Sequence, residues 1–139
     1  MDNSSSVLPA VIPAASLQGL NTLAVPASAD YLVQVSTLEQ LRAVLIWRQQ
    51  QPAVRDLPVV PLGGGSNIVL AGNVQGLVVR LNIVGREIVR EDADSVWIRA
   101  GAGENWHDFV SFCVGFHYWG LENLALIPGS MGAAPIQNI

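Results

Sequence analysis

One segment in the first half of the chain shows hydrophobic residues at helical spacing. Leu38, Leu41, Val44 and Leu45 are three or four residues apart, so they fall on one arc of a helical wheel. Polar residues occupy most of the remaining positions up to Pro52. This spacing predicts an amphipathic helix that covers a core and ends before that proline.

Polar residues predict where this helix begins. Ser36 with Glu39, or Thr37 with Gln40, can close a capping box in which side chains satisfy the first free N–H groups. Arg48 is an exception to the pattern, since it lies on the apolar arc. It stands in the last turn, where its stem can cover apolar surface and its charge suits the helix end, so we expect a structural role for it.

Short β-prone runs lie before and after this helix, and a second helical pattern follows them. The runs cover residues 31–35, 58–62, 76–81, 87–90 and 95–100. Residues 104–116 return to helical spacing, with an apolar face formed by Trp106, Phe109, Val110, Cys113 and Val114. Helix, strands and helix together predict an α+β fold.

The two ends of the chain differ from this pattern. Residues 1–16 are rich in Ser, Pro and Ala without a period, which predicts an extended or disordered leader rather than a packed element. The folded part is then expected over residues 17–139. Its last stretch, Leu121 to Ile139, contains one charged residue, Glu122, and we expect it to be buried.

Composition narrows the possible partners. A chain of 139 residues, 50% of them hydrophobic, is long enough for one domain or part of a larger one. With 13% charged residues and a net charge of -4, it has no basic surface for nucleic acid. No apolar run of roughly 18 residues predicts a membrane span, and the acidic start is unlike a signal peptide.

Cysteine and histidine usage points to a reducing compartment without a metal site. Cys113 is the only cysteine, so no internal disulfide can form and a cytoplasmic location fits. His107 and His117 lack a second ligand type at metal spacing. We therefore expect no bound metal.

The first candidate for chemistry is a glycine-rich loop after a predicted strand, formed by Gly63, Gly64, Gly65, Ser66 and Asn67. Glycine lets the backbone approach a ligand closely, and successive N–H groups can cradle a phosphate. No lysine follows the glycines and the G-x-G-x-x-G spacing is absent, so the donors would be neutral. The alternative is a tight turn with a small polar cap.

Two further segments are rich in small residues. Residues 126–135 are uncharged and contain two prolines, so they can lie along an extended planar ligand or form a buried loop. Residues 101–106 place two glycines before the second predicted helix. For these glycines we favour a strand-to-helix connection with close packing.

Taken together, four motifs resemble the UDP-N-acetylenolpyruvoylglucosamine reductases in the same order along the chain. They are residues 63–67, 101–107, 120–129 and 135–139. The similarity begins near Ser16 and continues to the last residue. Leu23 stands where that family usually has an aromatic residue, and Ala133 replaces a frequent serine, which removes one possible hydrogen bond.

The resemblance implies a vanillyl-alcohol-oxidase-type (PCMH-type) FAD-binding domain, incomplete at its C-terminal end. It implies that Gly63 to Asn67 contact the FAD diphosphate. Other positions that match the FAD-lining loop of the family are Ile127, Pro128, Gly129, Gly132, Ala133 and Ile136. A small, neutral wall of this kind suits a flat isoalloxazine ring.

The family reaction converts UDP-N-acetylglucosamine enolpyruvate to UDP-N-acetylmuramate for peptidoglycan, with hydride passing from NADPH to FAD and then to the substrate. In that family the catalytic residues and the substrate domain lie beyond the match at Ile139, so the resemblance implies no catalytic residue here and no turnover by this chain alone. Another flavin oxidoreductase of the same fold, or a non-catalytic flavin- or nucleotide-binding fragment, stays open. The oligomeric state also stays open.

Overall fold

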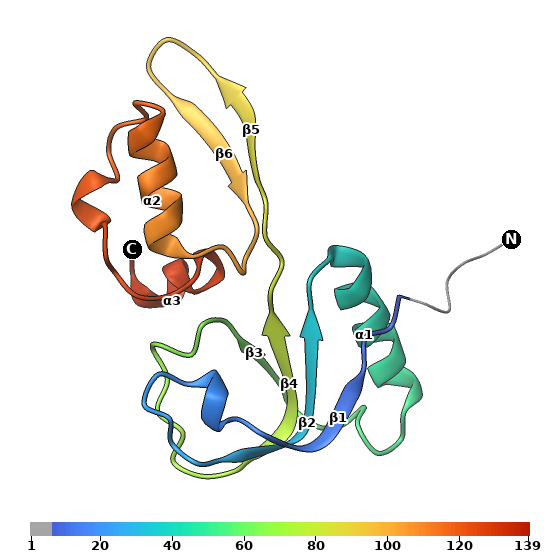
Figure 1. Cartoon of the computed structure of the whole chain (residues 1–139). Coiled ribbons are helices and arrows are strands. Elements are labelled where there is room, and N and C mark those ends of the chain that lie inside the picture. The colour runs from blue at the N-terminus through green and yellow to red at the C-terminus, as the bar shows by residue number, and fades with distance from the viewer. Residues whose placement is uncertain (1–6) are drawn as a thin grey trace, which may run out of the picture.

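The computed structural model describes residues 7–139, which form two units joined by a stretch of extended chain (Figure 1). The first unit consists of β1 (Val11–Ser16), β2 (Ser28–Val35), α1 (Leu38–Gln50), β3 (Val59–Leu62) and β4 (Val74–Leu81). The second consists of β5 (Arg86–Glu91), β6 (Val96–Ala100), α2 (Trp106–Gly115) and α3 (Ala134–Gln137). Single 3₁₀ turns lie at Gln18–Leu20, Glu122–Leu124 and Met131–Ala133. The arrangement confirms the α+β prediction.

The first unit is a four-stranded mixed sheet in the order β1-β2-β4-β3. β4 pairs in parallel with both β2 and β3, whereas β1 pairs antiparallel with β2. β1 and β3 therefore form the two edges. Because the β3 and β4 pairing ends at Leu62 opposite Arg80, the glycine-rich loop begins where the parallel strands end.

Both faces of this sheet are covered by apolar residues. In β2, Leu32 belongs to a core cluster on one face and Val33 to a cluster on the other, as alternation along a strand requires. In β4, Val78 and Val79 divide in the same way. Val44 of α1 belongs to the second cluster, so α1 covers that face of the sheet. Burial on both faces explains why the sequences of these strands are nearly continuous apolar runs.

The predicted cap of α1 forms, with one change of partner. Thr37 Oγ1 accepts a hydrogen bond from the Gln40 N–H at 3.1 Å. The Gln40 side chain in turn accepts from the N–H of Ser36 at 2.7 Å, one residue before the helix cap. Arg48 has the expected structural role, because its guanidinium donates to the Leu57 carbonyl at 2.6 Å and ties the helix end to the following loop.

The predicted apolar arc of α1 is only partly right. Val44 is buried, but Leu38 and Leu45 are 54% and 41% exposed. Trp47, which the arc omitted, packs beside Leu41 against the core, so the buried face is rotated from the expected one. Leu38 is exposed because it lines, together with Leu41, a cavity of about 470 Å³ between α1 and the second unit.

The interpretation of the residues before Ser16 as an unpacked leader is wrong for β1. Val11 pairs with Val33, and Ala15 pairs with Ala29 and is buried. Ala and Pro have low β-propensity, so the pattern gave no strand signal, but pairing with the apolar β2 stabilises an extended backbone there. Residues 1–6 of the expected leader lie outside the described residues.

The second unit packs α2 and the following turns beside the β5–β6 hairpin (Figure 1). The predicted buried face of α2 is confirmed at Trp106, Phe109, Val110 and Cys113, and burial raises the pKa of the Cys113 thiol. Val114 packs against the core but is only partly buried. These contacts fix the start of the last segment, since Trp106 Nε1 donates to the Leu124 carbonyl at 2.8 Å.

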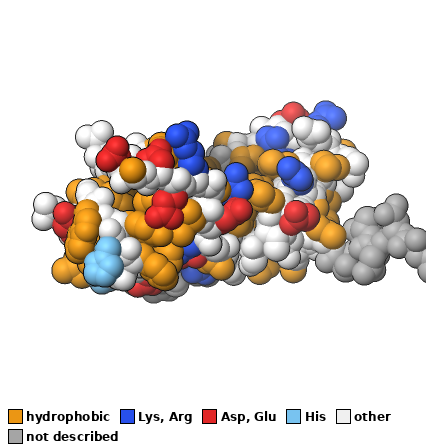
Figure 2. Space-filling model, turned by 90° about the horizontal axis from the view of Figure 1, so that it is seen from above, with side chains coloured by type: hydrophobic (Ala, Val, Ile, Leu, Met, Phe, Trp, Pro, Cys, Tyr) orange, Lys and Arg blue, Asp and Glu red, His pale blue; other side chains and the backbone are white. Residues whose placement is uncertain are grey.

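The expectation that Leu121 to Ile139 is buried is wrong for much of that segment. Leu126 and Ile136 are 76% and 79% exposed, whereas Ser130 and Ala134 are buried. The segment is a single layer over α2, so only its inner side is covered. Seen from above, hydrophobic side chains gather on the surface of the second unit, beside a histidine (Figure 2). Among residues 7–139, no helix is both long and apolar enough to cross a membrane.

Candidate functional site

The glycine-rich loop and the last segment meet across a small cavity between the two units. Its volume is about 100 Å³. One wall is the end of β3 with Gly63 to Asn67, and the other is the stretch from Gly129 to Gln137. The full lining comprises Pro61, Leu62, Gly63, Gly64, Gly65, Ser66, Asn67, Ile68, Gly129, Ser130, Ala133, Ile136 and Gln137. Segments more than 60 residues apart in the sequence thus form one site.

The three glycines of the first wall meet different requirements. A β-carbon on Gly65, where φ is 70°, would collide with the carbonyl oxygen of Leu20. A β-carbon on Gly63 would collide with Ser130 Oγ across the cavity. A β-carbon on Gly64 would meet no atom within 4 Å. Gly65 is therefore needed for packing against backbone, a side chain at Gly63 would have to displace the Ser130 hydroxyl, and Gly64 leaves open space beside the backbone.

Several backbone N–H groups of the first wall have no hydrogen-bond acceptor in the part of the chain that the structure describes. Within residues 7–139, no hydrogen bond has the N–H of Gly64, Gly65, Ser66 or Asn67 as its donor. The Gly65 carbonyl is used, because it accepts from the Thr22 N–H at 3.1 Å and so fixes the loop to the chain after the first 3₁₀ turn. A loop held by its carbonyl, with its N–H groups unpaired, is a typical anion-binding arrangement.

The second wall uses its donors internally. The N–H groups of Met131 and Gly132 donate to the carbonyls of Glu104 and Ala102, each at 2.9 Å. The Ala133 N–H donates to the Ser130 carbonyl at 2.9 Å. This wall therefore presents mainly small and apolar side chains to the cavity, of which Ile136 is the most exposed.

The structure separates the predicted residues of this second segment into two groups. Gly129, Ala133 and Ile136 line the cavity together with the glycine-rich loop. Ile127 instead packs toward the core below α2, and Gly132 lies against Ala102 so closely that a β-carbon would meet it at 2.9 Å. Pro128 is exposed and lies outside the cavity lining.

Five lining residues were not among those predicted: Pro61, Leu62 and Ile68, which flank the glycine-rich loop, and the polar residues Ser130 and Gln137. Ser130 is buried and faces Gly63, and the Gln137 side chain lies beside Gly129, where a β-carbon would meet its Nε2 at 2.6 Å. Both stand inside motifs that the sequence singled out, at residues 126–135 and 135–139. Their polarity among small and apolar neighbours was the available signal.

Charge and size define what this cavity can hold. Every lining side chain is neutral, so an anion would be bound by N–H groups, hydroxyls and amides rather than by Lys or Arg. Its volume of about 100 Å³ is smaller than the roughly 300–1,000 Å³ of typical small-molecule sites. The site therefore fits a compact part of a cofactor, such as a diphosphate, and not a whole dinucleotide.

Comparison with protein families gives one match over most of the chain. Residues 29–139 match a family described as the FAD binding domain. The matched region includes both walls of the cavity and the connection between them.

Individual relatives share a single name. UDP-N-acetylenolpyruvoylglucosamine reductase of Azoarcus sp. (strain BH72) is 50% identical over 134 residues, which are 94% of this chain and 38% of that protein. The protein of the same name from Flavobacterium johnsoniae is 39% identical over 124 residues, 89% of this chain and 35% of that protein. The chain thus spans little more than a third of the length of these relatives.

A solved structure agrees with these relatives. The crystal structure of UDP-N-acetylenolpyruvylglucosamine reductase from Thermus caldophilus superimposes with a TM-score of 0.59 and 29% identity, over 91% of this chain and 40% of that one.

Proposed function

This chain belongs to the FAD-binding domain family, and on that premise we propose that the cavity between Gly63–Asn67 and Gly129–Gln137 holds the diphosphate of FAD. Among the described residues, the N–H groups of Gly64 to Asn67 donate no hydrogen bond, and the proposal rests on this observation because a diphosphate needs several donors at once. Bound FAD would supply the capacity to accept and donate a hydride.

Each wall would have its own task. The N–H groups of the first wall would bind the phosphate oxygens, and the open space at Gly64 would let them approach without a side chain between. Ser66 and Asn67 would add neutral polar groups at the rim. Ala133 and Ile136 would exclude water on the opposite side, which strengthens hydrogen bonds in the cavity.

We further propose that the chain is the FAD-binding part of a UDP-N-acetylenolpyruvoylglucosamine reductase. The name that its relatives share, together with the family match, supports this assignment. The whole protein would use NADPH to reduce UDP-N-acetylglucosamine enolpyruvate in peptidoglycan synthesis, and its substrate chemistry would depend on residues that this chain does not contain. A cytoplasmic location is consistent with the single cysteine.

A titration with three ligands tests the cofactor assignment. The chain is titrated with FAD, with ADP and with riboflavin, following flavin fluorescence, the visible spectrum and, for ADP, calorimetric heat. If N–H groups hold the diphosphate, FAD binds saturably, and riboflavin, which lacks phosphate, binds at least about 10-fold more weakly. ADP binding then shows that the ADP half of FAD is recognised without the flavin.

Two outcomes contradict the proposal in different ways. If FAD does not bind, the cavity does not form a cofactor site in this chain. If riboflavin binds as tightly as FAD, the flavin is recognised elsewhere and the glycine-rich loop has no phosphate to hold.

A further inference from the structure

The second wall of the cavity is attached to the chain before α2 by a short ladder of backbone hydrogen bonds. Trp106 donates to the Gly129 carbonyl at 3.1 Å, and Met131 and Gly132 donate to the carbonyls of Glu104 and Ala102. Asn105 and Ser130 face each other in this bridge. The position of the wall therefore depends on where residues 102–106 lie.

Residues 101–104 are held in turn by the chain that joins the two units. The N–H groups of Gly101 and Gly103 donate to the carbonyls of Gly85 and Ile83 at 2.9 and 2.8 Å. A β-carbon on either glycine would collide with the backbone between Asn82 and Val84. This confirms that these two glycines are there for close packing, and it places residues 101–104 directly against the extension of β4.

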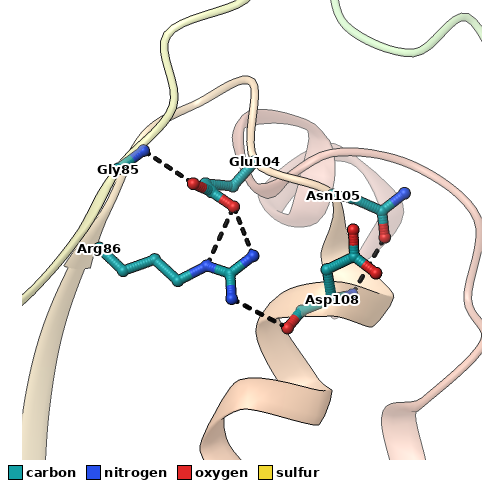
Figure 3. A network of polar contacts seen from close by, with 5 residues as sticks. All are labelled: Gly85, Arg86, Glu104, Asn105 and Asp108. Atoms are coloured by element: carbon teal, nitrogen blue, oxygen red, sulfur yellow. Dashed lines mark hydrogen bonds and ion pairs between the residues drawn. The ribbon is translucent and has the colours of Figure 1, made fainter.

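The side chain of Glu104 strengthens this attachment (Figure 3). Its carboxylate accepts from the Gly85 N–H at 2.7 Å, and its other oxygen accepts from Nε and Nη2 of Arg86 at 3.0 and 2.6 Å. The side chains of Arg86 and Glu104 are only 25% and 12% exposed. The hydrogen bond from the Gly85 N–H holds the pKa of the Glu104 carboxyl below its usual range, and Arg86 acts in the same direction.

Arg86 extends the network to α2. Its Nη1 donates to the carbonyl of Asp108 at 3.1 Å, and its guanidinium lies 5.4 Å from the ring centre of Phe112. Asn105 caps the same helix by accepting from the Asp108 N–H at 3.1 Å (Figure 3). One ion pair thus joins the start of β5, the start of α2 and the ladder to the cavity wall.

We infer that Arg86 and Glu104 form a positioning pair that sets the separation between the two walls of the cavity. The path is continuous: the glycine-rich loop follows β3, β3 pairs with β4, β4 leads to Gly85, and Glu104 joins Gly85 to the segment that holds residues 129–132. Within residues 7–139, the side chains of the pair form no hydrogen bond with a residue that lines this cavity, so the pair would act on a ligand through the backbone. This inference rests on the proposed function for its link to FAD affinity.

Paired variants separate positioning from general stability. Glu104→Ala removes the carboxylate, and Glu104→Gln keeps an oxygen that can accept from the Gly85 N–H. Glu87→Ala is the matched control, because Glu87 pairs with Arg99 at 2.9 Å on the same hairpin but both side chains are more than 60% exposed. Val44→Ala, in the core of the first unit, gives a destabilised control with an unchanged cavity.

Two measurements are made on each folded variant, FAD affinity and amide hydrogen exchange at Met131 and Gly132 without FAD. We expect Glu104→Ala to weaken FAD binding about 10-fold and to accelerate exchange at both amides about 10-fold. Glu104→Gln should change both FAD affinity and amide exchange less than Glu104→Ala does. The two controls should match the original chain in FAD affinity and in exchange at these amides.

Each outcome decides the inference. Unchanged exchange at Met131 and Gly132 in both Glu104 variants would overturn it, as would equal losses of affinity in Val44→Ala. If Glu104→Ala fails to fold, Glu104→Gln alone supplies the comparison. If the original chain does not bind FAD, the proposed function fails, while the exchange rates still show whether the pair positions the wall.

Discussion

The two walls of the cavity hold their backbones in opposite ways. The glycine-rich loop is fixed by the Gly65 carbonyl and by contact with Leu20, while its N–H groups from Gly64 to Asn67 donate no hydrogen bond within residues 7–139. The segment around Gly129 is fixed by its own N–H groups, and its small side chains line the cavity. The proposed diphosphate site would use both surfaces, backbone donors from the first wall and small side chains from the second.

This difference changes how substitutions at glycine should be interpreted. In the first wall, loss of binding after a change at Gly65 would report on folding, because its β-carbon position is occupied by the backbone of Leu20. After a substitution at Gly64, by contrast, loss of binding would report on contact with the ligand. The following predictions test the contrast, beginning with the largest effect.

Gly65→Val should destabilise the chain by about 3 kcal/mol or more, because a β-branched residue is strained at positive φ and its β-carbon would collide with a carbonyl. Urea denaturation without any ligand measures this. Gly72→Val is the control, since a β-carbon there would meet no atom within 4 Å. Equal denaturation midpoints for the two variants would contradict a packing role for Gly65.

Gly64→Val should weaken FAD binding about 100-fold with little change in stability, because the new side chain occupies the space beside the free N–H groups. Fluorescence titration gives the affinity and urea denaturation gives the stability, again with Gly72→Val as the control. FAD affinity within a factor of two of the original chain would remove the first wall from the cofactor site.

Lowering the pH should weaken the attachment of the second wall, because it protonates the Glu104 carboxylate. Since its folded pKa lies below the unfolded value of about 4.3, the stability it contributes is present above that pH and is lost as pH falls through the folded pKa. Glu104→Gln should therefore be less stable than the original chain by about 1 kcal/mol at neutral pH, and the gap should close in acid. Urea denaturation from pH 7 to about pH 3 measures this gap.

The control for the acid experiment is again the exposed pair on the hairpin. Glu87→Gln should differ from the original chain by a few tenths of a kcal/mol or less across the same pH range, because solvent screens that ion pair. A constant gap for Glu104→Gln at every pH would mean that its ionisation does not stabilise the fold.

Much of the secondary structure could be predicted from the sequence, because it depends on local periodicity. The five β-prone runs and both helices lie where the patterns placed them. β1 was missed, since Ala and Pro form a strand there only through pairing with β2. The rotated face of α1 was also missed, because Leu38 faces a cavity that depends on the second unit and not on the helix itself.

The candidate site was predictable as two segments but not as a geometry. The glycine motif and the small-residue segment do lie together. Nothing local in the sequence distinguishes Ile127, which packs inward, from Ile136, which faces the cavity. The direction of each side chain is set by the ladder between residues 102–106 and 129–132, a contact between distant parts of the chain.

The strand order of the first unit also bears on how the chain behaves at high concentration. Both edge strands contain a proline, Pro13 in β1 and Pro61 in β3, and proline has no N–H to offer to an incoming strand. An edge interrupted in this way is a poor template for strand addition, the first step of many aggregates. The β5–β6 hairpin, which has no proline, instead presents charged side chains along its length. The two sheets thus differ in what would oppose intermolecular pairing, a missing N–H at each edge of the first and the solvation of charged side chains in the second.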